Sequence, residues 1–314
     1  MKPTLTEQFY QRRPRIDLPD ADAFHSGRGK DSKARRRSMK FAINFANFGY
    51  LGDVRCLADL ACDAEAAGWD GVFLWDHVNW ADMGFHADPW IALGIIAMRT
   101  ERILIGTGVT PIARRRPTKL AREILTLDQL SDGRFVFGAG SGLWPSEFDD
   151  LGDSADLRVR AEMLDEGLAL LQELWSGNPV QFEGTHYQAQ TQSFAAAGSS
   201  PRIPIWLAGT WPNRKPFRRA ARYDGVMAIN QDFSQPLSSQ SVTEIAELIA
   251  TNRVTDEPFE IVCGLRTSDD AQADIARVQE YEAAGATWWM DSVFPAMEPL
   301  ESARARIRRG PPRG

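Results

Sequence analysis

Short apolar runs alternate with amphipathic stretches from Met39 almost to the end of the chain, and this alternation restricts the fold more than any other feature. Eight runs are rich in the β-branched and aromatic residues of buried strands, and a stretch with helical periodicity follows each one. The expected strands are Phe41–Phe45, Gly71–Trp75, Ile103–Thr107, Arg134–Gly138, Ile203–Gly209, Gly225–Ile229, Phe259–Gly264 and Thr287–Met290. The expected helices are Val54–Ala67, Pro89–Met98, Pro117–Leu130, Leu157–Trp175, Lys215–Arg222, Val242–Ala250, Ala271–Ala284 and Leu300–Arg309. Eight such units within about 275 residues predict an α/β protein with a (β/α)8 TIM barrel.

An open, doubly wound parallel sheet is the alternative arrangement of the same elements. That fold usually carries a GxGxxG motif after its first strand, and no such motif follows Phe41–Phe45. We therefore expect the closed barrel, in which the residues that perform chemistry lie at the C-terminal ends of the strands.

The connection between the fourth helix and the fifth strand is longer than a minimal barrel requires. Residues 176–201 form this inserted segment, and its stretch PVQFEGTHYQA predicts a small hairpin that turns at Glu183–Gly184. Long excursions of this kind often serve as lids. A second long loop, Trp80–Asp88, follows the second strand and contains His86.

Residues 1–38 differ in composition from the rest of the chain. They contain ten lysines and arginines and five acidic residues, whereas the whole chain has a net charge of −6. We expect a disordered extension, or a true start of translation at Met39, ahead of a barrel domain over residues 39–314. An arm that binds nucleic acid or a membrane is the alternative, but the segment lacks interleaved aromatic residues and an apolar anchor.

Composition argues against several classes of function. The chain has no run of 18 apolar residues and no signal-like segment, so we expect a soluble, cytoplasmic protein without a membrane partner. The acidic balance of residues 39–314 argues against a nucleic-acid partner. The cysteines, Cys56, Cys62 and Cys263, lack CxxC spacing and are expected to be reduced core residues.

The second expected strand ends in Trp75-Asp76-His77, and His77 is the one histidine at a strand end. An imidazole in this place can donate or accept a proton near neutral pH, and the neighbouring Asp76 can support it. The alternative is that Asp76 caps the loop and His77 is a hydrogen-bonded structural residue. A metal site is not expected, because the first strand has no HxH motif.

Other chemistries find little support. The chain has no GxSxG motif for a nucleophilic serine. Glu147 and Asp149 follow the fourth strand and could be a glycosidase pair, but the two catalytic carboxylates of such enzymes usually come from different strands.

The third and fourth expected strands, in ILIGTGV and RFVFGAGSG, both end in glycines. Glycine lets a planar ring approach the backbone closely, so a flat ligand is expected against these strand ends. Arg114-Arg115-Arg116 could meet a phosphate, although we expect at least two of the three to be solvated. After the fifth strand, free N–H groups and the Thr210 hydroxyl could form an anion cradle.

Three stretches together resemble the bacterial luciferase-like group of flavin- and deazaflavin-dependent oxidoreductases. They are GTGVTPIARRRPTKLAREILTLDQLSDGRFVFGAGSGLWPSEF, LLQELWSGNPVQFEGTHY and IPIWLAGTWPNRKPFRRAARYDG, and the resemblance covers nearly all of residues 40–311. It implies a (β/α)8 barrel with an inserted segment and a flavin or deazaflavin ring in the barrel mouth. In the family a bulge after strand three, often with a non-proline cis peptide, supports the ring, and this bulge maps to Gly108–Val109.

The resemblance also implies the residues of the site. The cofactor-binding residues would be Asn47, Gly108, Val109, Thr110, Gly140, Ser141, Gly142, Gly209, Thr210 and Trp211. The cofactor phosphate would lie at Ser141–Gly142 and at the Gly209–Thr210 turn. Asp76 and His77 match the Asp-His pair of deazaflavin-dependent members, in which the histidine assists hydride transfer.

Two positions depart from the family pattern. Leu143 stands where the deazaflavin-dependent sugar-phosphate dehydrogenases carry an acidic residue, so a sugar phosphate is not the expected substrate. Ser141 stands where luciferase carries an arginine, so the phosphate would be held differently.

The main functional expectation is a monooxygenase in which reduced FMN and O2 oxidise a small organic substrate. The alternative is a coenzyme F-420 (deazaflavin) enzyme that transfers hydride without oxygen chemistry, and the lesser alternative is a flavin-binding barrel without turnover. A separate flavin or deazaflavin reductase and a homodimer would be the partners. Several of the many tryptophans are expected to line an apolar pocket.

Overall fold

The computed structural model describes residues 38–80, 83–195 and 202–313. The expected N-terminal extension therefore falls, except for Ser38, outside the described residues. Within the described ranges, no helix is both long and apolar enough to cross a membrane. In the same ranges, no three histidine, cysteine or acidic side chains gather as a metal ion would require.

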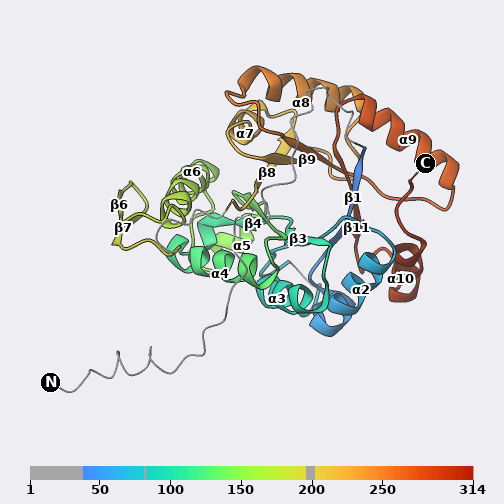
Figure 1. Ribbon diagram of the computed structural model, residues 1–314, viewed down its shortest axis with the longest axis horizontal. Coiled ribbons are helices and arrows are strands. Elements are labelled where there is room, and N and C mark those ends of the chain that lie inside the picture. The colour runs from blue at the N-terminus through green and yellow to red at the C-terminus, as the bar shows by residue number, and fades with distance from the viewer. Residues whose placement is uncertain (1–37, 81–82, 196–201, 314) are drawn as a thin grey trace, which may run out of the picture. The chain divides into compact units, whose positions relative to one another are not determined.

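Eight parallel strands close into a barrel, which confirms the predicted fold (Figure 1). The order is β3-β2-β1-β11-β10-β9-β8-β5, and a β3–β5 pairing joins the two ends. The strands are β1 (Lys40–Phe45), β2 (Gly71–Leu74), β3 (Leu104–Thr107), β5 (Phe135–Gly140), β8 (Ile205–Trp211), β9 (Gly225–Asn230), β10 (Glu260–Gly264) and β11 (Trp288–Val293). The two-residue strand β4 (Thr110–Pro111), which the sequence did not predict, adds to the C-terminal end of β5.

Large side chains fill the inside of the barrel. The inner cluster is Ala42, Phe73, Val136, Trp206, Met227, Val262, Trp288 and Met290. Phe73 stacks on Trp206 at 5.3 Å, and Trp206 meets Trp288 edge to face at 5.3 Å. Because these rings occupy the axis, a ligand can enter only at the ends of the strands.

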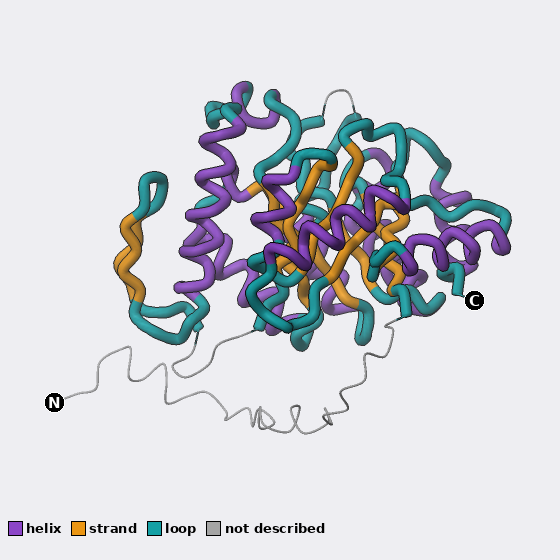
Figure 2. Tube along the Cα trace, turned by 90° about the horizontal axis from the view of Figure 1, so that it is seen from above, coloured by secondary structure: helices purple, strands orange, loops and turns teal. Residues whose placement is uncertain are grey.

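Helices surround the strands on the outside (Figures 1 and 2). They are α2 (Val54–Ala66), α3 (Pro89–Arg99), α4 (Pro117–Leu130), α6 (Leu157–Leu174), α7 (Arg214–Ala220), α8 (Ser239–Asn252), α9 (Ala271–Ala283) and α10 (Leu300–Arg309). Asp53, Asp88 and Asp156 cap the first turns of α2, α3 and α6, because each side chain accepts a backbone N–H group there. The expected helices are thus confirmed, with boundaries that differ by a few residues.

The last helix packs against the first. The Trp69 indole, just after α2, donates to the Ile307 carbonyl of α10 at 2.9 Å. Asp63 of α2 forms ion pairs with Arg304 at 3.3 Å and Arg308 at 3.0 Å. These contacts close the ring of helices in the same place where β11 pairs with β1.

A buried ionic cluster fastens α10 to β11. Arg306 contacts Asp291 through Nη1 and Glu298 through Nη2, each at 2.5 Å. The Thr267 hydroxyl donates to Asp291 at 2.5 Å, and Arg266 adds a second cation to Glu298 at 3.1 Å. Burial raises the pKa of Asp291, and Arg306 opposes that shift. One guanidinium therefore holds two buried carboxylates in place.

The insertion contains the predicted hairpin, formed by β6 (Val180–Glu183) and β7 (Gln188–Thr191). Glu166 of α6 accepts the backbone N–H groups of Thr185, His186 and Tyr187 at 2.8–3.3 Å. The hairpin lies beyond α6, away from the strands (Figure 1). The described part of the insertion thus packs on α6 and does not cover the strand ends as a lid would. Residues 196–201 lie outside the described residues.

Candidate active site at the end of strand β2

The segment after β2 is held in place from its neighbour β1. The Asn47 side-chain amide, fully buried, donates to the carbonyls of His77 at 3.1 Å and Ala87 at 2.7 Å. His86 supports the same loop, because its Nε2 accepts the Trp80 N–H at 3.3 Å. Asn47 was predicted to bind cofactor, and this role stays a prediction. Its amide nitrogen ties two loop carbonyls together, and its Oδ1 has no hydrogen-bond partner.

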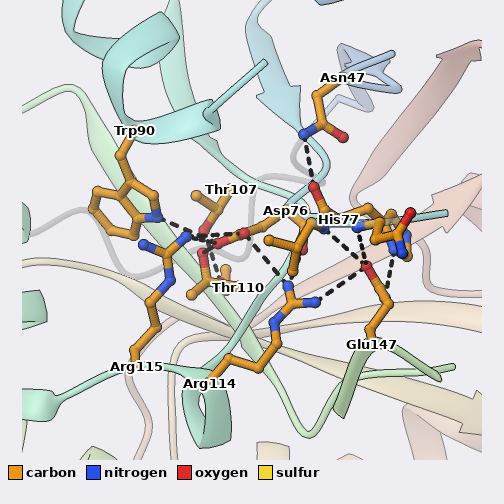
Figure 3. Close-up of polar contacts among 12 residues, drawn as sticks. Asn47, Asp76, His77, Trp90, Thr107, Thr110, Arg114, Arg115 and Glu147 are labelled. Atoms are coloured by element: carbon orange, nitrogen blue, oxygen red, sulfur yellow. Dashed lines mark hydrogen bonds and ion pairs between the residues drawn. The ribbon is translucent and has the colours of Figure 1, made fainter. Parts of the chain in front are cut away.

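The His77 imidazole forms a pair with Glu147 (Figure 3). Nδ1 of His77 lies 2.8 Å from Oε2 of Glu147, and the His77 side chain is 16% exposed. The Glu147 carboxylate comes from α5 (Ser146–Asp149), a short helix after β5 that the sequence did not predict. Since the carboxylate accepts from Nδ1–H, the neutral ring presents Nε2 as a proton acceptor.

Glu147 is buried and held as a carboxylate. Its Oε1 accepts the Val78 N–H at 2.9 Å and lies 3.1 Å from Nη1 of Arg114. Burial by itself raises the pKa of Glu147. The hydrogen bond and charge of His77, the Arg114 charge and the Val78 N–H outweigh burial and lower that pKa from 4.5 to about 2.

Glu147→Gln is expected to remove a pH-dependent part of the stability. Because the folded pKa lies below the ordinary value, the carboxylate stabilises the folded state fully above about pH 4.5 and progressively less toward about pH 2. The difference in unfolding free energy between wild type and variant should be constant near neutral pH and shrink as the pH falls. Urea unfolding at a series of pH values measures it. The control is Asp150→Asn, at an exposed position beside α5. A Glu147→Gln difference that is independent of pH would contradict the pair.

Asp76 lies in a buried ionic site rather than in the open mouth. It is 4% exposed, and Nη2 of Arg115 lies 2.9 and 2.8 Å from its two oxygens. The Thr110 hydroxyl donates at 2.8 Å and the Trp90 indole at 3.3 Å. Arg114 binds the Asp76 carbonyl and also contacts Glu147. Asp76 is therefore placed to act through these neighbours, and its predicted catalytic role stays a prediction.

This network corrects one further expectation. Of the three consecutive arginines, only Arg116 is exposed, because Arg114 and Arg115 turn inward to Asp76. Thr110 is fully buried and its hydroxyl donates to Asp76, and its predicted role in binding the cofactor stays a prediction.

The glycines of β3 and β5 serve packing between the strands themselves. A Cβ on Gly138 would lie 1.8 Å from the Thr107 carbonyl oxygen, and one on Gly106 would lie 2.5 Å from the Val136 oxygen. Packing against a neighbouring strand is therefore enough to explain glycine at these two positions, and the flat ligand expected at the strand ends stays a prediction. The Gly108–Val109 peptide is cis, as the family resemblance implied.

The strand ends predicted to hold the cofactor phosphate lie beside a buried arginine. Arg160 of α6 is 3% exposed, and its Nη1 donates to the Ser141 carbonyl at 3.3 Å. A Cβ on Gly142, which has φ +82°, would lie 3.3 Å from the same Nη1. Among the described residues Arg160 forms no ion pair with a carboxylate, and its Nε has no hydrogen-bond partner. Burial lowers the pKa of Arg160, and Asp149 and Asp156 oppose that shift.

The other predicted cofactor residues lie at the ends of β5 and β8. Gly140 is buried against Val109, which is half-buried, and a Cβ on Gly209 would meet the Phe217 ring at 2.9 Å. Thr210 is half-buried, whereas Trp211 is 8% exposed and packs edge to face on Phe217 at 5.5 Å. The cofactor role of these residues stays a prediction.

Three residues of the site were missed from the sequence. Glu147 had been considered only with Asp149 as a glycosidase pair, and nothing in the chain links it to His77, 70 positions away. Nothing in the sequence distinguishes Arg114, which faces inward, from Arg116, which is exposed. Arg160 lies in an amphipathic helix, where a basic residue usually faces solvent.

Comparison with known proteins identifies relatives over most of the chain. The family model described as Luciferase-like monooxygenase matches residues 38–309. The F420-dependent glucose-6-phosphate dehydrogenase of Nakamurella multipartita is 34% identical over 171 residues, 50% of this chain and 47% of that protein. The F420-dependent hydroxymycolic acid dehydrogenase of Mycobacterium tuberculosis is 33% identical over 175 residues, 54% of this chain and 48% of that protein.

The fold also matches solved structures. An F420-dependent secondary alcohol dehydrogenase in complex with an F420-acetone adduct superposes with a TM-score of 0.71 at 18% identity, over 88% of this chain and 98% of that one. At that identity the match supports the fold alone. The chain spans about half the length of the two curated relatives named above.

Proposed function

The chain belongs to the luciferase-like monooxygenase family of oxidoreductases, and from this premise we propose that it is an F420-dependent dehydrogenase that oxidises an alcohol or reduces the corresponding ketone. The proposal rests on the His77–Glu147 pair at the end of β2, a proton carrier set beside a strand end. The curated relatives at about one-third identity are F420-dependent dehydrogenases, which supports F420 over the FMN that the sequence had favoured.

The residues present suit such a cofactor in two respects. The mouth offers aromatic walls, with Trp75 and Trp80 stacked at 5.5 Å beside His77. Arg160 supplies a buried cation, without a carboxylate partner in the described residues, at the strand end where the phosphate was predicted. Bound F420 would exchange a hydride with the substrate carbon.

The protein then has to move one proton. In the oxidation direction the substrate C–H bond breaks as hydride leaves, and the O–H proton passes to Nε2 of His77, so that a C=O bond forms. Glu147 stabilises the imidazolium produced, because its carboxylate is already bonded to Nδ1. Arg114 in turn fixes Glu147 and the loop at Asp76.

The cofactor is tested by parallel equilibrium titrations with F420 and with FMN, followed by the fluorescence of the ring. Saturable binding of F420 with much weaker binding of FMN supports the proposal. Tighter binding of FMN would instead restore the monooxygenase reading and direct the search toward a flavin reductase.

Arg160→Ala is expected to weaken F420 binding about 10- to 100-fold, because a charge-assisted hydrogen bond contributes about 1.5–3 kcal/mol. The matched control is Arg122→Ala. Arg122 also lies over a phenylalanine ring, that of Phe194 at 3.9 Å, as Arg160 lies over Phe148 at 4.3 Å. Equal losses in the two variants would show that Arg160 does not hold the phosphate.

A further inference from the structure

A continuous row of aromatic rings leads from His77 to the surface. The Trp80 ring lies 5.0 Å from the His77 ring, and Trp144 lies 5.9 Å from Trp80. Phe233 continues the row at 6.2 Å from Trp144. We call His77, Trp80, Trp144 and Phe233 the aromatic row. Its members come from the loops after β2, β5 and β9, so three strand ends contribute to one apolar path.

The outer part of the row is open to solvent. Phe233 is 53% exposed and Leu143, next to Trp144, is 40% exposed. Val78, next to His77, is 52% exposed. Single exposed apolar side chains are common on protein surfaces, whereas several of them around one site indicate a binding surface. Exposing such a cluster to water is unfavourable until a ligand covers it. A ligand that covered these side chains would remove them from water without changing the packing of the fold.

The loops around the row lack cations. Residues 75–80, 83–88, 141–156, 231–238 and 294–299 contain no lysine or arginine and carry several acidic residues, among them Asp232. Of the inward-facing cations near these loops, Arg114 is engaged by Asp76 and Glu147, and Arg160, beside Ser141, is assigned to the cofactor phosphate. An anionic group on a substrate would find no partner along the row and would meet like charge.

We infer that the substrate is uncharged and largely apolar, with its hydroxyl or carbonyl at Nε2 of His77 and its hydrocarbon part along the aromatic row. The inference rests on the proposed function for the kind of reaction, whereas the preference for an apolar chain follows from the row itself. It distinguishes this chain from relatives that act on a sugar phosphate, in agreement with Leu143 standing where those carry an acidic residue.

The test is tryptophan fluorescence of the full chain, without cofactor and saturated with F420, titrated with four probes: 2-butanone, 2-octanone, octanoate and glucose 6-phosphate. Burial of a methylene strengthens binding up to about fourfold, so 2-octanone should bind at least about tenfold more tightly than 2-butanone. Octanoate should bind at least about tenfold more weakly than 2-octanone. Comparable binding of the two ketones, or tighter binding of either anion, would overturn the inference.

Two variants keep the test independent of folding. Trp144→Ser should lower the affinity for 2-octanone about three- to tenfold and leave that for 2-butanone unchanged, because only the longer chain extends past Trp80 to Trp144. Val254→Ser removes an apolar side chain that is 93% exposed and lies outside the row, and should change neither affinity. A loss shared by both ketones in Trp144→Ser would contradict the chain-length argument.

The same titrations separate the two proposals. If F420 does not bind but 2-octanone binds with the expected chain-length dependence, the proposed function fails and the apolar site stands. If F420 binds and the ketones show no dependence on length, the substrate inference fails and the proposed function stands.

Discussion

Replacing His77 by alanine is expected to lower kcat for the F420-dependent reaction about 10²- to 10⁴-fold, the usual contribution of a general acid or base. F420 should still bind, because the cofactor phosphate is assigned to Arg160 and the strand ends rather than to the imidazole. Stopped-flow measurement of cofactor reduction, together with the F420 titration, gives both quantities.

The matched control is His186→Ala, which removes a histidine of similar exposure, 18%, from the β6–β7 hairpin. We expect turnover close to wild type in that variant. If turnover survives His77→Ala as well, the His77–Glu147 pair is structural and the proton must move elsewhere. If the wild-type protein and the His77→Ala variant both bind F420 but neither turns it over, the barrel carries the cofactor without catalysis.

Replacing Arg306 by methionine is expected to destabilise the fold by about 3–5 kcal/mol, the cost of leaving a buried charge without its partner. The loss is large because Asp291 and Glu298, at 0% and 7% exposure, both depend on this guanidinium. Arg266 reaches only Glu298 and cannot replace it at Asp291. Urea or thermal unfolding measures the change.

Arg99→Met is the control for that prediction. Arg99 pairs with Asp59 at 2.6 Å, but the two side chains are 45% and 51% exposed, so the expected cost is about 0–1 kcal/mol. A loss in Arg306→Met no larger than in Arg99→Met would mean that water or rearrangement compensates the two carboxylates.

The spacing of apolar residues predicted the barrel because it reflects which side chains of each strand and helix are buried. The period of apolar residues distinguishes strand from helix, and eight repeats leave few folds open. The sequence could not show which glycines serve which purpose. Gly138 is required because the Thr107 carbonyl lies against it, and a ligand in that place would demand the same residue.

The site was predictable only where its residues adjoin a strand end. His77 lies just after β2 and was predicted as a site residue. Its partner Glu147 lies in α5, which is too short to show a helical pattern of apolar residues in the sequence. Arg114 and Arg115 face inward because Asp76 lies there, and a run of three arginines carries no signal of that direction. Pairings between distant loops depend on how the barrel closes, which one sequence does not report.

The pairing of β1 with β11 has a consequence for synthesis on the ribosome. β1 pairs with β2, which follows it closely in the sequence, and with β11, which lies more than 200 residues later. During translation, one edge of β1 therefore stays unpaired until β11 has been made. The Asp63 and Ile307 contacts of α10 likewise form last. Until β11 has been made, the edge of β1 that pairs with it keeps backbone N–H and C=O groups without strand partners, and a chaperone can bind such an edge. Slowing translation late in the message would lengthen that exposure, whereas an early pause would not.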